Sequence, residues 1–211
     1  MKTIRLFLFY SLLLFPSMIL RAQSEKGSFS GGGVFSLGSR STISLFEHDG
    51  PGLGTGGQFR IQLNKSVNTD WFADYITINV KDKVRSEYLH IGWSVLYYPF
   101  PNQDFPKRFR PYFMAGHCFD YNKKTLVDDA SISLDRWGSA VQGGIGTHFQ
   151  VNERFDVSLN CQYMIHLTKE IESDLQKGAV GLHQHSNKTL EGHLLSTISL
   201  NYKLFHLWNR R

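Results

Sequence analysis

Apolar and polar residues alternate with a period of two along most of the chain after its first two dozen residues. This period is typical of β-strands that have one apolar and one polar face. In the clearest example, Val157 and Leu159 alternate with Ser158 and Asn160. The pattern predicts eight strands, at residues 27–38, 52–63, 71–81, 87–100, 110–121, 136–149, 154–167 and 190–205.

The composition of the polar faces indicates which side of these strands meets lipid. Alternation alone fits a soluble barrel with an apolar interior as well as a membrane barrel with an apolar exterior. A face exposed to water would carry many lysines and glutamates. Here the polar faces are mainly Gly, Ser, Thr, Asn and Gln, and their few charges are Arg60, Asp120, Asp156, Glu191 and Lys203. We therefore assign the apolar faces to lipid, including Ile76, Ile78 and Val80 of the third strand.

The connections and the aromatic residues predict the same arrangement. Long connections at 39–51, 122–135 and 168–189 alternate, with one exception, with shorter ones, as in barrels with short periplasmic turns and long extracellular loops. Aromatic residues also gather at strand ends, as in the two girdles of such barrels. One predicted girdle contains Trp71, Phe72, Tyr97, Tyr98, Phe100, Phe149, Phe155, Tyr202 and Phe205, and the other contains Phe35, Tyr88, Phe119, Tyr121 and Trp137. We predict an all-β, eight-stranded, antiparallel up-and-down transmembrane barrel.

The first 22 residues have the features of an export signal. Lys2 and Arg5 precede an apolar run that ends near Leu20, which is too short for a membrane-spanning helix. Cleavage is expected between Ala22 and Gln23, which leaves residues 23–211 as the barrel domain. An Ala-Gln junction of this kind resembles those of exported Bacteroidetes proteins.

Charge and cysteine content exclude several classes of function. The formal charge of +5 includes three basic residues and no acidic ones from the predicted signal, so 20 basic residues oppose 18 acidic ones afterwards. This near balance gives no electrostatic footprint for nucleic acid. The two cysteines, Cys118 and Cys161, fall on separate predicted strands, so neither a disulfide nor a zinc knuckle is expected.

Two segments carry a family resemblance. Residues 143–159, in which a Gly-rich strand, a tight turn and a second alternating strand follow one another, and residues 110–116 before them resemble outer-membrane β-barrel proteins of the OmpX/OmpA-barrel or PorT-like type. The likeness extends over nearly all of the predicted mature chain. It implies a monomeric outer-membrane barrel that contacts membrane lipid, lipopolysaccharide and partner proteins. Such barrels usually end on an aromatic residue; here Phe205 is followed by six further residues.

An eight-stranded barrel has an interior that side chains just fill. We predict a hydrogen-bonded lumen in which Arg60 and Lys203 pair with Asp156 or Glu191. The predicted lumen-lining residues are Gln58, Arg60, Gln62, Asn79, Gln142, Asp156, Asn160, Gln162, Glu191 and Lys203.

Histidines form the one concentration of metal-ligating residues. His166 and His193 face inward on neighbouring predicted strands, and the connection between them carries His183 and His185. These imidazoles could converge to bind a divalent metal or respond to pH. Solvated loop histidines are the alternative, and no cofactor is expected.

The string from His183 to Asn187 raises an enzymatic alternative, because it resembles the His-x-Ser-Asn element of barrel lipid A deacylases of the PagL type. The candidate catalytic residues are Ser186, His185 and Glu191. His185 is the immediate neighbour of Ser186, however, and a base must lie on the same strand face as its hydroxyl. We expect a non-enzymatic protein with a structural or surface-interaction role, and keep the deacylase, a narrow channel and a secretion accessory as alternatives.

Overall fold

The computed structural model describes residues 32–46, 50–80, 82–100, 109–167, 171–176, 179–184 and 192–208. Ten strands occur in these ranges: β1 (Val34–Phe46), β2 (Gly50–Gln62), β3 (Val67–Val80), β4 (Val84–Tyr97), β5 (Phe109–Leu126), β6 (Ser133–Gln150), β7 (Phe155–His166), β8 (Ile171–Gln176), β9 (Ala179–Gln184) and β10 (Gly192–His206). Within the same ranges no helix is long and apolar enough to cross a membrane. The predicted signal and its cleavage site at Ala22 and Gln23 lie outside the described residues.

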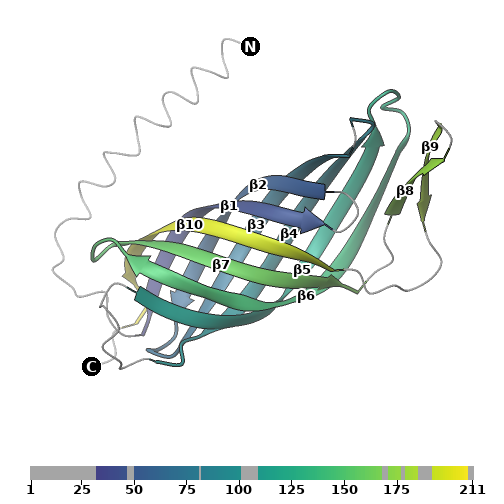
Figure 1. Cartoon of the computed structure of the whole chain (residues 1–211). Coiled ribbons are helices and arrows are strands. Elements are labelled where there is room, and N and C mark those ends of the chain that lie inside the picture. Colours follow the sequence, from purple (N-terminus) through teal and green to yellow (C-terminus); the bar gives the residue numbers. More distant parts are fainter. Residues whose placement is uncertain are drawn as a thin grey trace, which may run out of the picture.

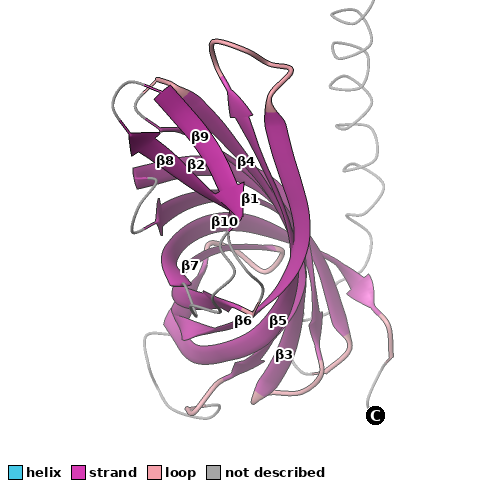
Figure 2. Cartoon of the chain, turned by 90° about the vertical axis from the view of Figure 1, so that its right-hand side faces the viewer, coloured by secondary structure: helices cyan, strands magenta, loops and turns pink. Residues whose placement is uncertain are grey.

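Eight of the strands form one closed antiparallel barrel, in the order β1-β10-β7-β6-β5-β4-β3-β2 (Figure 1). Each strand pairs with its neighbour in sequence, except that β7 pairs with β10 across an inserted hairpin made of β8 and β9. The ladder between β1 and β10 closes the cylinder, from Val34 opposite His206 to Phe46 opposite His193. Figure 2 shows the strands curling around the lumen, with loops at both ends. The predicted fold class is confirmed.

The two faces of the barrel differ as the alternation predicts. Outward-facing Leu37, Ile145 and Ile198 are each more than half exposed, whereas inward-facing Ser36, Gln142 and Thr197 are buried. A continuous band of exposed Leu, Ile, Val and aromatic side chains is stable only against lipid or another apolar surface. The outer wall of this barrel is therefore its lipid-facing side.

Barrel strands occupy most of two of the three long loops that we predicted, so these predictions were wrong. β1 begins at Val34 and continues to Phe46, through most of 39–51, and β5 and β6 extend into 122–135. The error arose because inward-facing polar residues such as Arg40 and Thr42 are of the types common in loops. The structure buries both in the lumen. The third connection contains the hairpin of β8 and β9.

The predicted faces of the third strand were also wrong. Ile76, Ile78 and Val80 point into the lumen, and Asn79 faces outward. The reason is that part of the lumen is apolar: these side chains pack in one cluster with others from across the barrel, namely Val84, Tyr88, Cys118, Ala140, Met164 and Leu195. In this region a rule that polar residues face inward assigns every side chain to the wrong side.

Aromatic residues form an outward ladder near the end of the barrel where β1 starts and β10 ends. Phe35 stacks on Phe205 with ring centroids 5.2 Å apart and on Phe59 at 5.9 Å, and Phe59 stacks on Trp71 at 5.9 Å. Phe35 therefore belongs to this lower girdle and not to the opposite one. Three other residues assigned to girdles, Phe72, Tyr88 and Tyr98, are buried inside the lumen.

Glycines allow neighbouring strands and their side chains to pack closely inside the barrel. A Cβ atom added at Gly144 would lie 2.3 Å from the Cys161 carbonyl oxygen and 2.6 Å from the Gln162 Cα atom. At Gly143, on the opposite face, the nearest atom would be the Met114 carbonyl oxygen at 3.8 Å. Of these two positions, only that of inward-facing Gly144 has no room for a side chain.

We therefore expect Gly144→Ala to destabilise the barrel by about 1–3 kcal/mol, the usual cost of overpacking, and Gly143→Ala to leave its stability unchanged. The urea midpoint at which the folded, faster-migrating band disappears from unheated gels measures both. Equal midpoints for the two variants would contradict the close packing at Gly144.

Candidate functional site in the barrel lumen

Arg60 is the centre of a buried ionic network in the lower half of the lumen. Its Nε atom lies 2.8 Å from Asp70 Oδ1, and its Nη1 atom lies 3.1 Å from Asp156 Oδ1. Its Nη2 atom donates to Ser158 Oγ at 3.0 Å. Arg60, Asp70 and Asp156 come from β2, β3 and β7 and are all buried. One guanidinium thus connects three strands across the barrel interior.

A chain of hydrogen-bonded side chains extends this network. The Ser158 hydroxyl lies 2.6 Å from His148 Nδ1, and the other ring nitrogen of His148 lies 2.7 Å from the Tyr98 hydroxyl. Asn68 Nδ2 donates to the same hydroxyl at 2.7 Å. The Asp156 carboxylate lies 3.9 Å from the same Nδ1 atom that contacts Ser158, whereas the other ring nitrogen of His148 contacts Tyr98. In a catalytic triad the carboxylate and the serine contact opposite ring nitrogens, so this arrangement satisfies buried polar groups and differs from a triad.

A second ion pair lies above the first. Arg40 Nε is 3.0 Å from Asp74 Oδ1, and the Arg40 guanidinium lies 4.3 Å from the centroid of the Phe72 ring. Arg40 also donates to Gln58 Oε1 at 3.4 Å, and Gln58 donates to Asn201 Oδ1 at 2.5 Å. The Asn201 amide in turn donates to the Asp156 carboxylate that pairs with the first arginine. Arg40 and Arg60 are thereby connected through a chain of side-chain hydrogen bonds.

Nearer the opposite end, four side chains form what we call the histidine cluster: His90 of β4, Asp120 of β5, His166 of β7 and His193 of β10. His166 Nε2 lies 3.0 Å from His193 Nδ1, and His166 Nδ1 lies 3.2 Å from Asp120 Oδ2. The His90 ring is stacked at 5.7 Å from the His193 ring. All four side chains are buried, with exposed fractions of 0–3%.

The structure places the predicted lumen residues as follows. Buried on the inner face are Gln58, Arg60, Gln142, Asp156 and Gln162, and partly buried on the same face are Gln62, Asn160 and Lys203. Asn79 faces outward, which corrects the prediction for that residue. Glu191 lies outside the described residues, and the expected pair of Arg60 with Asp156 is present.

The other candidates separate into two groups. His166 and His193 come together as the alternation predicts, whereas His183 lies on β9, in the hairpin separate from the barrel sheet. Ser186 and His185 lie outside the described residues, so the deacylase alternative stays a prediction. Asp74 was missed because the faces of the third strand were assigned in reverse, and Asp70 because the strand was predicted to begin at residue 71, whereas β3 begins at Val67.

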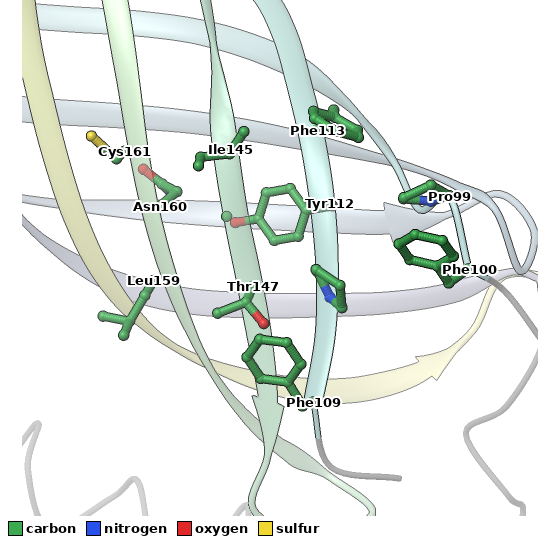
Figure 3. Close-up of a pocket in the computed structure, with 12 residues that line it drawn as sticks. Pro99, Phe100, Phe109, Tyr112, Phe113, Ile145, Thr147, Leu159, Asn160 and Cys161 are labelled. Carbon is green, nitrogen blue, oxygen red and sulfur yellow. The ribbon is translucent and has the colours of Figure 1, made fainter. Parts of the chain in front are cut away.

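An apolar depression of about 530 Å³ lies on the outer wall near the lower girdle (Figure 3). Phe113, Ile145 and Leu159 form much of its surface and are 43–60% exposed. The smaller residues Gly146, Thr147 and Cys161 leave space between them. Because this wall faces lipid, the depression is suited to hydrocarbon chains, and the polar network of the barrel is confined to the lumen.

Replacing Arg60 should be far more costly than replacing an exposed arginine. Arg60→Leu leaves Asp70 and Asp156 buried without their counter-charge, which typically costs about 3–5 kcal/mol. Arg85 forms a surface pair with Glu87 at 3.0 Å and is 55% exposed, so Arg85→Leu should cost at most about 1 kcal/mol. Urea titrations followed by the folded gel band compare the two variants. Similar losses of stability in the two variants would show that the ion pairs of Arg60 do not stabilise the barrel more than a surface pair does.

Comparisons with known proteins agree with this geometry. A model of the family described as outer membrane protein beta-barrel domain matches residues 7–185. A major outer membrane protein of Thermus thermophilus is structurally similar, with a TM-score of 0.56, 11% identity, and coverage of 81% of this chain and 98% of that one. Neisserial surface protein A gives a TM-score of 0.52 and 12% identity, with coverage of 82% of this chain and 96% of that one.

At these identities the structural likeness concerns the fold alone. A search of curated proteins found no significant match. The family match extends over most of the chain, and the closed eight-stranded barrel with a lipid-facing exterior is the architecture that the family name describes. The chain belongs to the outer membrane protein beta-barrel family of bacteria.

Proposed function

We propose that this protein is a closed outer-membrane barrel that presents its β5–β6 hairpin for contacts at the cell surface. The observation that carries the proposal is the length of this hairpin, since β5 and β6 have 18 residues each whereas β7 has 12. The surface role, its partners and the orientation in the membrane are all parts of the proposal.

The packing of side chains inside the lumen argues against a transport function. The side chains of Arg60, Asp70 and Asp156 are connected across the interior, and Arg40 of β1 joins Gln58 of β2 and Asp74 of β3. In an eight-stranded barrel the interior is only wide enough to be filled by side chains. A solute would have to break buried ion pairs to pass, so we favour an anchor over a channel.

The hairpin extends well beyond the bilayer. A strand of 18 residues tilted as in small barrels spans roughly 45 Å along the barrel axis, compared with an apolar band of about 25 Å. In Figure 1 the β5–β6 hairpin lies at the end of the barrel where β8 and β9 lie. There β5 ends level with β4, because Leu126 pairs with Val84, whereas β6 continues to Ser133 beyond the pair of Ala140 with His166 that ends β7. Longer loops of outer-membrane barrels are extracellular, so we assign this end to the outside.

The outer part of the hairpin carries apolar side chains that a purely solvated turn does not need. Val127, Ile132 and Trp137 are 55%, 47% and 62% exposed. Aromatic and aliphatic residues gathered on a protruding element typically mark a contact surface. We expect these exposed apolar side chains to contact either a second membrane protein or the lipopolysaccharide that surrounds the barrel.

The orientation is tested by labelling single cysteines from outside. In a background with Cys118 and Cys161 replaced by Ser, Ser131→Cys at the β5–β6 turn should react with a membrane-impermeant maleimide on intact cells. Glu153→Cys, exposed in the opposite turn, should react only after permeabilisation. The reverse pattern would overturn the assignment of the two ends.

The surface role is tested by a photo-crosslinking amino acid at position 132 in growing cells. We expect a discrete adduct with lipopolysaccharide or with one protein, and we expect it to disappear when Trp137 is replaced by Ala in the same chain. A crosslinker at Val151, which is 59% exposed in the opposite turn, should not give this adduct. If position 132 yields no adduct while the barrel folds normally, the hairpin does not provide a contact surface.

A further inference from the structure

We propose that the histidine cluster is a binding site for a divalent transition metal such as Zn²⁺, with His90, His166 and His193 as ligands. The proposal is independent of the surface role of the hairpin, because it concerns side chains inside the barrel. It differs from the site expected from the sequence, which used His183 and His185 in place of His90.

The spacing of the three imidazole rings suits a shared ion. Their centroids are 4.9 Å apart for His166 and His193, 5.7 Å for His90 and His193, and 6.5 Å for His90 and His166. Three imidazoles bound tetrahedrally, with metal–nitrogen distances of about 2.0–2.1 Å, have ring centroids about 5 Å apart. The His166 and His193 rings are already at this separation, whereas the His90 ring must move closer to both of them.

Asp120 prepares His166 to act as a ligand. Its Oδ2 atom lies 3.2 Å from His166 Nδ1, where it favours a proton on that nitrogen. The lone pair is then on Nε2, the atom that faces His193 at 3.0 Å. A carboxylate that fixes the tautomer of a histidine in this way is the usual outer partner of a metal-bound imidazole.

Buried polar atoms in the cluster also suit a bound cation. Among the described residues, His90 Nε2 and Asp120 Oδ1 are buried without a hydrogen-bond partner. Such atoms are costly to bury unless they are paired or coordinate a metal. The Arg136 guanidinium approaches Asp120 Oδ2 only to 3.9 Å, which is beyond hydrogen-bond distance.

Further charges surround the site. Asp74 of β3 is the direct cross-strand neighbour of His90, and Asp120 is its neighbour on the other side. The Asp74 carboxylate pairs with Arg40 at 3.0 Å. Two carboxylates thus flank His90, and two arginines compensate them. An added divalent ion would interact favourably with both carboxylates.

Binding requires only side-chain movements. In the described part of the chain, no three histidine, cysteine or acidic side chains already direct their donor atoms at one centre. His193 Nδ1 already lies 3.0 Å from His166 Nε2, and a shift of the His90 ring would bring its nitrogen toward the same point. His166 is the last residue of β7 and His193 the second of β10, so the site lies beside the strand ends. A bound metal would join the two strands that hold the β8–β9 insertion.

The proposal is tested with the full barrel, refolded in detergent without a polyhistidine tag and freed of metal. Zn²⁺ titration by calorimetry and Co²⁺ titration by visible absorption report the stoichiometry and the ligand type. We expect one ion per barrel and the absorption bands of a nitrogen-ligated, four-coordinate cobalt. His166→Gln or His90→Gln should weaken binding at least 100-fold, and Asp120→Asn should weaken it about 10- to 100-fold, as for other outer partners of ligands.

Two controls separate this site from other sources of binding. His117→Gln removes a partly buried, outward-facing histidine of β5 and should leave the affinity unchanged. A variant that lacks both His183 and His185 should also bind normally. The folded gel band shows that each variant still forms a barrel. The proposal fails if the wild-type barrel binds no Zn²⁺ or Co²⁺ at 100 µM metal, or if the loop variant loses binding while His90→Gln and His166→Gln retain it.

Discussion

Closure of the sheet between β1 and β10 is the constraint on which the rest of this structure depends. In a bilayer, an unpaired backbone N–H or C=O group has no water to bind, so a spanning sheet must satisfy every such group within itself. The ladder from Val34 to Phe46 against β10 removes the last free edges. Once the cylinder is closed, alternate residues must face either lipid or a narrow interior, and the composition of each face follows from this division.

The features particular to this barrel are found among its inward-facing side chains. Its inner residues include Arg40 and Arg60, the three aspartates that pair with them, and a cluster of histidines around Asp120. Charges placed in so narrow a space are stable only when they are paired, and the pairs connect strands that lie far apart in the sequence. An apolar cluster around Ile76 and Met164 occupies part of the same interior. The lumen thus resembles a protein core of mixed polarity more than an aqueous channel.

The sequence was sufficient to predict the barrel because the period of two is a direct consequence of strand geometry. Strand β7, where Val157 and Leu159 alternate with Ser158 and Asn160, and the pair of Arg60 with Asp156 were both predictable. The faces of β3 were not, because Ile78 packs inside against residues from other strands and Asn79 faces out. That error concealed Asp74, the partner of Arg40, and the late start predicted for the strand concealed Asp70, the second partner of Arg60. The contact of His90 with His166 and His193 depends on strand order and stagger around the closed cylinder, which no local pattern specifies.

The central claim is that the lumen is closed by side chains, and single-barrel conductance in a planar bilayer tests it most directly. The account predicts that the wild-type protein, inserted and folded, produces no sustained current steps in 1 M KCl at moderate voltage. The reason is that Arg60, Asp70 and Asp156 are paired across the interior of an eight-stranded barrel, which is only wide enough to be filled by side chains. Stable, ohmic steps from the wild-type protein would contradict the account, because they would require water to replace this network along the whole barrel.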